Sequence, residues 1–370
     1  MLLLPKNCSL ILSVFYFLAL GLQGAFVHPG ILHTEDAFAV MRQKVASKNG
    51  PAYGSFLRLK KSHFSSADYK AKGAKKVIGR KGYRQGSRSD FRATYQNALM
   101  WKITGDDAHA RKAMAILEDY AEHLERVDFK ADGPLLVGLQ GFLFVNGAEI
   151  MRTYEGMTPE KLKRIQEMFR KVFIPVCEKF YAKKPFSNGN WGAAVTKGCM
   201  GYAIFTDNEK LYQDALKFYR SGRDNGSLRY YIDGKTGQNQ EAGRDQQHSQ
   251  LGIACLAEAA EVAHHQGDDL YSAFDNRLLK GFEYVARYNL KGKVPYRRWE
   301  DLTGKYNRWK KISKRGKLRN IYTMAYNHYA IRKGLKMPYT SRVVRKIQPE
   351  REGIYADHPG YGSLLFLGTK

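Results

Sequence analysis

The polar segment between Gln238 and Leu256 carries the residues best suited to acid–base chemistry; its sequence is QNQEAGRDQQHSQLGIACL. If a helix begins at Glu241, then Arg244, Asp245 and His248 follow three, four and seven positions later and share its face. His248 near Arg244 is then a candidate base. The competing interpretation is a capping and salt-bridge network, in which the two carboxylates hold the arginine at a helix start.

A second polar segment, Pro185–Thr196, interrupts one helical pattern and begins another. Its sequence, PFSNGNWGAAVT, places Asn188, Asn190 and Trp191 at the expected helix start. The helix dipole and the amide donors would hold a carboxylate there, and the indole could stack on a sugar ring. An ordinary turn with an asparagine cap and a buried tryptophan is the competing interpretation.

Further amide side chains accompany both segments. A buried amide needs a hydrogen-bond partner, so Gln140 and Asn146 in the apolar segment Leu139–Glu149 either bond within the core or line a cavity that holds substrate. Around the first segment the amides outnumber what a helix cap requires, which favours a sugar or carboxylate ligand. These amides are Gln238, Asn239, Gln240, Gln246 and Gln247, and we expect Gln247 to contact substrate.

The charge balance indicates what kind of ligand this is. The 370 residues include 61 Lys and Arg but only 35 Asp and Glu, a formal net charge of +26. This imbalance favours a polyanionic partner: nucleic acid, an anionic membrane or an acidic polysaccharide. Basic residues gather in 58–88, which is either a solvated loop or a rim that attracts a negatively charged chain. They gather again in 291–320, where Tyr296, Trp299, Tyr306 and Trp309 are interleaved with them.

The N-terminus favours the polysaccharide among these partners. Lys6 precedes the apolar run Leu10–Leu20, and small residues follow, as in a secretory signal peptide. We therefore expect a signal over 1–24, one mature domain over 25–370, a secreted or periplasmic protein, no nucleic acid partner and no membrane contact after signal removal. An uncleaved membrane anchor is the alternative. The mature chain keeps Cys177, Cys199 and Cys255. They form either one disulfide and one free thiol, or three buried thiols.

The elements that must position these residues are helical. From Phe38 onward apolar residues recur at spacings of three and four, and alternating strand patterns are scarce. Linked helical hairpins either close into an α/α toroid or stack as an open solenoid. Because no clean repeat is visible, we expect an all-α, incomplete α/α toroid with 291–320 as an irregular or short-stranded loop at its mouth. The expected helices are about 35–48, 90–104, 107–127, 136–154, 158–183, 190–206, 208–221, 241–266, 268–287 and 321–333.

Other chemistries lack their sequence signatures. The chain has no phosphate-binding Gly-Lys-Ser/Thr loop, no dinucleotide glycine fingerprint, no His-Glu-x-x-His and no Gly-x-Ser-x-Gly. We therefore expect neither a metal nor a cofactor.

Six motifs follow one another along the mature chain: His28-Pro-Gly-Ile-Leu-His33, Tyr95–Asp106, Phe144–Arg152, Asn188-Gly-Asn-Trp191, Arg244-Asp-Gln-Gln-His248 and Tyr326-Asn-His-Tyr329. Together they resemble the alginate-lyase-like polysaccharide lyases with an α/α-toroid fold. The resemblance covers nearly the whole mature chain. It implies β-elimination of a 4-linked polyuronate, such as alginate, polymannuronate or glucuronan, that leaves an unsaturated uronate at the new non-reducing end.

In that reaction one group neutralises the uronate carboxylate, a base removes the C5 proton and an acid protonates the leaving O4. The resemblance implies Asn188 or Asn190 as the neutraliser and Arg244 as the cleft arginine. It implies His248 as a base or a second neutraliser.

The sequence departs from the better-known alginate lyases at two positions. Gly189 follows the asparagine where they have histidine, and Leu251 stands where they have tyrosine. We therefore expect the catalytic tyrosine in the basic loop, and prefer Tyr306 to Tyr296 because turn residues flank it. Nearby cations would lower the phenol pKa there and bind uronate carboxylates. The expected substrate contacts in this loop are Tyr296, Arg297 and Arg298.

Two other functions fit the same residues. A glycoside hydrolase on the same toroid would use paired carboxylates from among Glu149, Glu241 and Asp245. A non-catalytic secreted protein that binds polyanions needs only the charge and the signal peptide. The preferred uronic acid, endo or exo action and the oligomeric state stay open.

Overall fold

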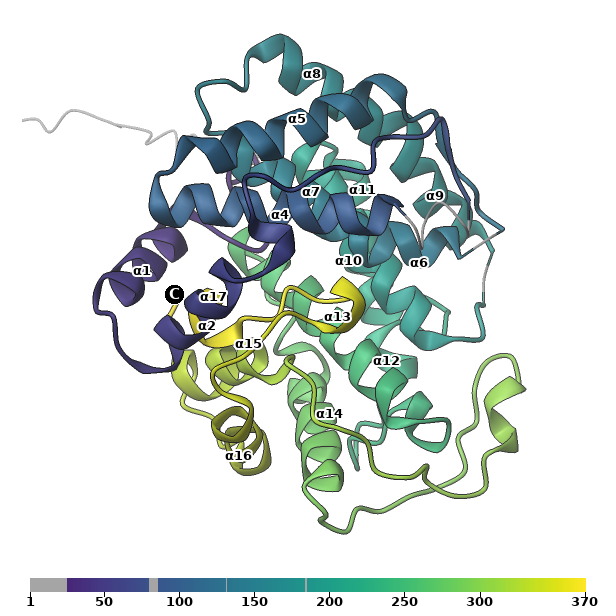
Figure 1. Ribbon diagram of the computed structural model, residues 1–370. Coiled ribbons are helices and arrows are strands. Elements are labelled where there is room, and N and C mark those ends of the chain that lie inside the picture. Colours follow the sequence, from purple (N-terminus) through teal and green to yellow (C-terminus); the bar gives the residue numbers. More distant parts are fainter. Residues whose placement is uncertain (1–24, 80–85, 131, 184) are drawn as a thin grey trace, which may run out of the picture.

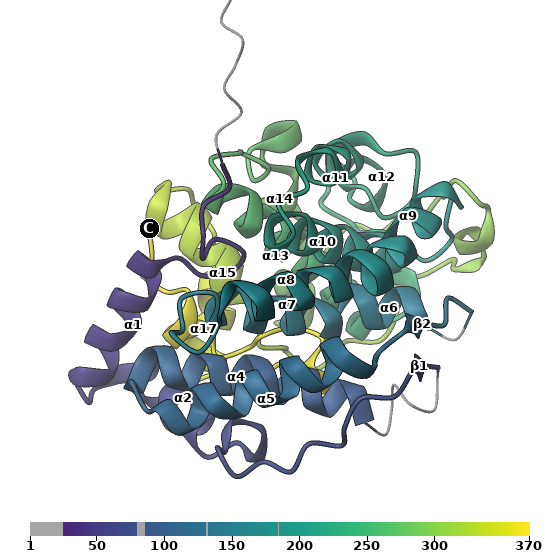
Figure 2. The same ribbon diagram turned by 90° about the horizontal axis from the view of Figure 1, so that it is seen from above.

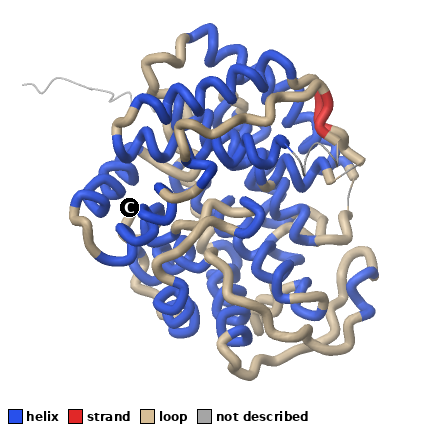
Figure 3. The backbone as a smooth tube through the Cα atoms, viewed as in Figure 1, coloured by secondary structure: helices blue, strands red, loops and turns tan. Residues whose placement is uncertain are grey.

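Helices make up nearly all the regular structure of this chain (Figure 3). The computed structural model describes residues 25–79, 86–130, 132–183 and 185–370, so the expected signal peptide and Cys8 lie outside the described residues. Within these ranges the only named strands are β1 (Val77–Ile78) and β2 (Arg126–Val127), which pair in parallel. The all-α prediction is confirmed.

The helices form an inner layer and an outer layer (Figures 1 and 2). Each inner helix contacts the next along the chain, and outer helices pack against them. The inner helices are α4 (Arg88–Thr104), α7 (Gln140–Met151), α10 (Gly189–Phe205), α13 (Gln246–His265) and α15 (Tyr322–Tyr326). The outer helices are α5 (Asp107–His123), α8 (Pro159–Met168), α9 (Ile174–Ala182), α11 (Glu209–Ser221), α14 (Ala273–Asn289) and α16 (Pro338–Ile347).

The ring closes where the two ends of the described chain meet. The short helix α17 (Gly362–Leu365) contacts α15 on one side and both α1 (Glu35–Ala46) and α2 (Gly50–Lys60) on the other, and α1 contacts α4. These contacts join the last inner helix to the first.

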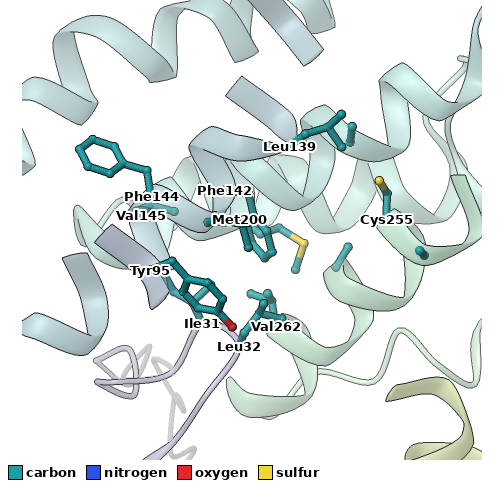
Figure 4. Packing of buried hydrophobic residues seen from close by; sticks show 14 of the residues in the cluster. Ile31, Leu32, Tyr95, Leu139, Phe142, Phe144, Val145, Met200, Cys255 and Val262 are labelled. Carbon is teal, nitrogen blue, oxygen red and sulfur yellow. The ribbon is translucent and has the colours of Figure 1, made fainter. Parts of the chain in front are cut away.

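Composition explains which helices lie inside. Every residue of α7 is buried, and so is every residue of α10 except Trp191, because most residues of these helices are apolar or small and the few polar ones are paired inside the fold. The outer helices α8 and α11 instead bury one stripe of apolar residues and expose charged ones. Figure 4 shows Phe142 of α7, Met200 of α10 and Val262 of α13 converging in the core.

Two glycines let α10 pack closely against α6 (Gly133–Gly138). A Cβ on Gly138 would lie 2.4 Å from the backbone carbonyl carbon of Ala194, and one on Gly198 would lie 3.1 Å from the Cα of Gly138. The backbones of the two helices therefore touch without side chains between them. The stretch Gly133–Met151 is long and apolar enough to span a membrane, but 94% of it is buried inside the fold, as is typical of a core helix.

Several element boundaries differ from the prediction. The helix α2 was not predicted because Gly50, Pro51 and Gly54 have low helix propensity, yet packing against α17 stabilises it. The predicted helix 136–154 is divided at Leu139, and 158–183 contains a π-helical turn at Phe169–Phe173. The segment 291–320 is irregular apart from one 3-10 turn, as predicted.

The basic stretch 58–88 is partly tied to the core. In its described part, the buried carboxylate of Asp90 accepts hydrogen bonds from the Tyr69 hydroxyl at 2.8 Å and from the backbone N–H of Lys72 at 2.9 Å. Tyr69 and the backbone at 72–73 are therefore anchored, while the side chains of residues 70–72 stay exposed, as the solvated-loop interpretation expects. The three mature cysteines are all free and buried, which resolves the alternative left by the sequence.

A buried ion pair links the deep parts of α10 and α13. The Lys197 side chain is fully buried, and its Nζ donates to the Glu258 carboxylate and, at 3.0 Å, to the backbone carbonyl of Asp357. The other oxygen of Glu258 lies 2.6 Å from Nδ1 of His358. Removing one member of such a pair leaves an uncompensated buried charge.

We predict that Lys197→Ala lowers the free energy of unfolding by about 3–5 kcal/mol, measured by urea denaturation. The control is Lys210→Ala, which removes an exposed lysine that pairs with Asp214 within α11; its unfolding midpoint should match the parent. Equal midpoints for all three proteins would contradict a structural role for the buried pair.

Candidate active site

The candidate site lies where the N-terminal ends of α10 and α13 meet the basic loop. The two helices run in the same direction, because Asn190 near the start of α10 contacts Glu241 just before α13, and Lys197 contacts Glu258 deeper in the fold. Asn188 therefore lies beside the segment that carries Arg244. Tyr306 reaches both from the 3-10 turn Lys305–Arg308.

The first polar segment is not the single helix that was predicted. Gln240–Gly243 forms a 3-10 turn, and α13 begins only at Gln246 because Asp245 is its N-cap. The extended backbone of Asp245 lets its Oδ1 accept the His248 N–H at 2.7 Å. The capping interpretation is thus correct for Asp245. The prediction that Glu241, Arg244 and His248 share one face of a single helix is wrong. The turn before α13 nevertheless brings these side chains together.

A continuous chain of hydrogen bonds joins the four predicted catalytic residues. Oδ2 of Asp245 lies 2.6 Å from Nδ1 of His248, and Nε2 of the same ring lies 3.1 Å from Nη2 of Arg244. Nη1 of Arg244 donates to the Tyr306 hydroxyl at 3.1 Å, and that hydroxyl donates to Oδ1 of Asn188 at 2.9 Å. Three separate segments of the sequence supply this chain.

These contacts define the state of the imidazole. Because a guanidinium only donates, Nε2 of His248 is the acceptor in its contact with Arg244, and the geometry places the ring proton on Nδ1, facing Asp245. Partial burial opposes ionisation of Asp245, but hydrogen bonds from the His248 side chain and backbone outweigh it and lower the carboxyl pKa. The side chains of Arg244, Asp245 and His248 are 27%, 41% and 30% exposed, so a polymer can reach them.

Tyr306 differs from the prediction in its electrostatics. The residue is buried, and burial together with the Glu241 carboxylate raises its phenol pKa above the usual value, although Arg244 acts in the opposite direction. The lowered pKa that was predicted is wrong because the cations of the loop do not face the phenol. Arg297 pairs with Asp233 at 2.6 Å, and Arg298 donates to the Asn307 carbonyl.

Glu241 forms the floor of the site. Its side chain is fully buried and accepts hydrogen bonds from Asn190 Nδ2 and, at 3.4 Å, from Arg244, and its Oε1 lies 3.3 Å from the Tyr306 hydroxyl oxygen. Burial raises its pKa, against the effect of Arg244 and His248. The sequence singled out this carboxylate as part of the polar cluster and as a candidate for hydrolysis; nothing local showed that it would contact a tyrosine 65 residues away.

The structure distinguishes the two asparagines. Asn190 is buried and bound to Glu241. Asn188 is half-buried, its oxygen accepts from Tyr306, and among the described residues its Nδ2 has no hydrogen-bond partner. Of the two, Asn188 is therefore the one with a free amide donor. Trp191 stacks on Phe186 with ring centroids 5.1 Å apart, so at least one face of its indole is already covered.

Two other predicted substrate contacts lie in the core. Gln140 is buried and donates to the Tyr355 carbonyl and to Asp357, each at 2.9 Å. Asn146 is buried and accepts the Leu32 N–H at 3.0 Å. Both therefore satisfy neighbouring polar groups and do not line the site, which corrects the prediction. The reason is that α7 is buried on every side.

The remaining predicted contacts surround the site. The Tyr296 hydroxyl donates to the Trp309 carbonyl at 2.8 Å, which leaves Tyr306 as the tyrosine that touches Arg244. Gln247 is exposed on α13 beside His248. Glu149, a carboxylate considered for hydrolysis, lies elsewhere, 2.6 Å from Nδ1 of His28. Within the described ranges no group of three His, Cys, Asp or Glu side chains could hold a metal ion.

The ring of helical hairpins is an α/α toroid, the fold of the solved structures compared below. Residues 62–295 match the family model described as alginate lyase, and the chain belongs to the alginate lyase family. No curated protein matches the sequence significantly.

Solved structures share the fold at low sequence identity. An alginate lyase from Bacteroides ovatus is 15% identical with a TM-score of 0.60, over 92% of this chain and 99% of that one. Alginate lyase A1-III from Sphingomonas species A1 is 13% identical with a TM-score of 0.62, over 91% and 97%. A substituted form of A1-III complexed with a tetrasaccharide gives a TM-score of 0.64 at 14% identity, over 93% and 97%.

We predict that Asp245→Asn lowers the kcat of lyase activity by on the order of 100-fold or more, because an amide can donate to Nδ1 and reverse the imidazole tautomer. Nε2–H would then face the donors of Arg244. Nitrogen NMR of the His248 ring should report the change of tautomer. The control is Asp214→Asn, an exposed residue of α11, which should retain parent activity; full activity in Asp245→Asn would contradict this account of the site.

Proposed function

We propose that the chain cleaves a 4-linked polyuronate of the alginate or glucuronan type by β-elimination. The observation that carries this proposal is the direct contact of Asn188, Tyr306, Arg244 and His248 in one partly exposed cluster. The net charge of +26 supports an acidic polysaccharide as the substrate. The tetrasaccharide complex of the A1-III relative supports a sugar chain as the ligand.

Neutralisation of the uronate carboxylate makes the C5 proton removable. Two donors lie near the Tyr306 hydroxyl: the guanidinium of Arg244 and the Nδ2 of Asn188, which has no hydrogen-bond partner in the part of the chain that the structure describes. A substrate carboxylate that accepts from both would lose much of its charge, and the carbanion that develops at C5 would be stabilised as the enolate form. Only Arg244 carries a full positive charge, so it supplies the larger electrostatic effect.

Two proton transfers complete the elimination. Nε2 of His248 accepts from Arg244, so turning the arginine toward substrate frees this lone pair to take the C5 proton. Tyr306 holds its proton because burial raises its pKa, and it gives that proton to O4 as the C4–O4 bond breaks. The electron pair of the C5–H bond becomes the C4–C5 double bond.

The location of the reaction follows from the expected signal peptide. We propose that the mature chain, residues 25–370, acts in the extracellular or periplasmic space, where acidic polysaccharides occur. Residues 6–20 carry the sequence pattern that supports this.

The decisive experiment incubates the mature protein, with a chelator present, with alginate, polymannuronate, polyguluronate, glucuronan and hyaluronan. Ultraviolet absorbance of the unsaturated uronate should rise on at least one 4-linked polyuronate. Tyr306→Phe should lower kcat by about 10²–10⁴-fold with little change in KM, because it removes only the proton donor. Tyr326→Phe, a half-buried tyrosine of α15, is the matched control. New reducing ends without absorbance would instead identify a hydrolase.

The pH profile distinguishes the two possible forms of Tyr306. Because its pKa is raised above the usual value of about 10, the phenol stays protonated through neutral and mildly alkaline pH. We predict that kcat/KM shows no rise attributable to tyrosine ionisation between about pH 8 and 10. A rise with a midpoint in that range, absent from Tyr306→Phe, would show that the phenolate is the reactive form.

A further inference from the structure

A buried asparagine outside the reactive cluster connects the two turns that carry Asn188 and Tyr306. Asn225 lies in the segment between α11 and α12 (Leu228–Tyr231), and its side chain is fully buried. The residue belongs to none of the segments that the sequence singled out. Its amide nitrogen and its amide oxygen each contact a different part of the site.

The Nδ2 end of Asn225 holds the turn before α10. It donates to the backbone carbonyl of Phe186 at 2.8 Å and, at 3.4 Å, to that of Ser187, the residue immediately before the proposed neutraliser. The segment that carries this amide lies directly against α10, because a Cβ on Gly226 would be 2.4 Å from the Cα of Gly192. The amide donor is therefore fixed relative to the first turn of α10.

The Oδ1 end of Asn225 holds the turn that presents Tyr306. It accepts the backbone N–H of Leu302 at 3.0 Å. Asp301 closes this turn, because its carboxylate accepts the Tyr306 N–H and, at 2.7 Å, the Thr303 N–H. A shift of Leu302 would therefore move the phenol as well.

Other parts of the basic loop are bound on the α13 side of the site. The Gln238 amide accepts from the Arg297 N–H at 2.9 Å and donates to the carbonyl of the same residue at 2.7 Å. The Ser313 N–H donates to the Ala242 carbonyl at 3.0 Å. Both partners belong to the polar segment that carries Arg244. Asn225 adds a buried connection to the α10 side, so the loop is held between the two helices.

We propose that Asn225 is a positioning residue, which sets the distance between the Tyr306 phenol and Asn188. This inference rests on the proposed function. The Tyr306 hydroxyl lies 2.9 Å from Oδ1 of Asn188, yet the two residues are 118 positions apart, so their alignment depends on the contacts between their turns. Proton transfer to O4 needs the phenol within hydrogen-bond reach of the bound uronate. A displacement of about 1 Å can lower the rate on the order of 100-fold.

The test exchanges the amide for a carboxylate of the same shape. In Asn225→Asp the Leu302 N–H keeps its acceptor, but an oxygen replaces the donor to Phe186. This oxygen also faces Asp301, whose Oδ1 lies 3.5 Å from the amide nitrogen of the parent. We expect kcat to fall at least about tenfold, with KM within about twofold of the parent.

The matched control is Asn327→Asp. Asn327 is also buried and also binds backbone at both ends of its amide: it donates to the Thr369 carbonyl at 3.0 Å and accepts the Gly368 N–H at 2.7 Å. Those partners are the last residues of the chain, not the turns of the site. The control should lose stability to a similar extent in urea denaturation and keep kcat within about twofold of the parent.

A double variant separates positioning from a general loss of structure. With Tyr306→Phe present there is no phenolic proton to align, so adding Asn225→Asp should change kcat by less than about threefold. Three results would overturn the proposal: a further tenfold fall in the double variant, full kcat in Asn225→Asp, or equal falls in Asn225→Asp and Asn327→Asp. If Asn225→Asp does not fold, Asn225→Ser and Asn327→Ser give the same comparison.

Failure of the proposed function gives a different result, because the parent would then form no unsaturated uronate from any polymer. Limited trypsin digestion with mass spectrometry then tests the connection itself, since Lys305 and Arg308 are exposed in this turn. Asn225→Asp should raise the rate of cleavage after either residue about tenfold, and Asn327→Asp should not. Equal rates in the parent and both variants would overturn the connection.

Discussion

The side-by-side packing of α10 and α13 in the same direction is the constraint on which the candidate site depends. Contacts at two depths fix it: Asn190 with Glu241 at the mouth, and Lys197 with Glu258 in the interior. Small residues allow the close approach of α10 to α6, where Gly138 and Gly198 meet. If either helix turned or slid, Asn188 would no longer lie opposite the segment that carries Arg244.

Electrostatic balance within the site contrasts with the strong positive charge of the whole chain. Arg244 lies between two carboxylates, Glu241 and Asp245, so its charge is compensated before substrate binds. Burial and Glu241 keep Tyr306 protonated, and Asp245 keeps His248 in one tautomer. In the proposed mechanism a uronate carboxylate competes for the donors of Arg244, which links binding to release of the imidazole. The same proposal gives the exposed cations of the basic loop the role of attracting the polymer.

Packing also explains how this chain departs from the better-known lyases. A Cβ on Gly189 would lie 2.5 Å from the Asn225 carbonyl oxygen and equally near Gln240, so no larger residue fits after Asn188. The Gly189 N–H instead donates to Gln240 at 2.8 Å, which secures the turn. At the other position Leu251 forms a pocket wall, and the phenol comes from Tyr306 in a distant loop. Tyr306 thus brings a phenol to Asn188 and Arg244 from a distant part of the chain.

The sequence by itself determined the features that depend on local spacing and composition. Periodic apolar residues and turn signals predicted an all-helical chain. The charge and the aromatic residues of 291–320 predicted that this segment lacks regular structure. The selection of Asn188, Arg244, His248 and Tyr306 also came from residue types and motifs. The structure brings these four together, while their catalytic roles remain the proposal made above.

Only the tertiary structure decided the features that depend on burial and long-range contact. It placed Gln140 and Asn146 in the core, because a helix surrounded by others has no face toward a cleft. It also reversed the expected direction of the Tyr306 pKa: sequence neighbours are cationic, but the phenol faces the buried Glu241 and its own desolvation. The spacing of residues along a chain indicates which of them share a helix. The pKa of a side chain also depends on its burial and on the charges of every element packed around it.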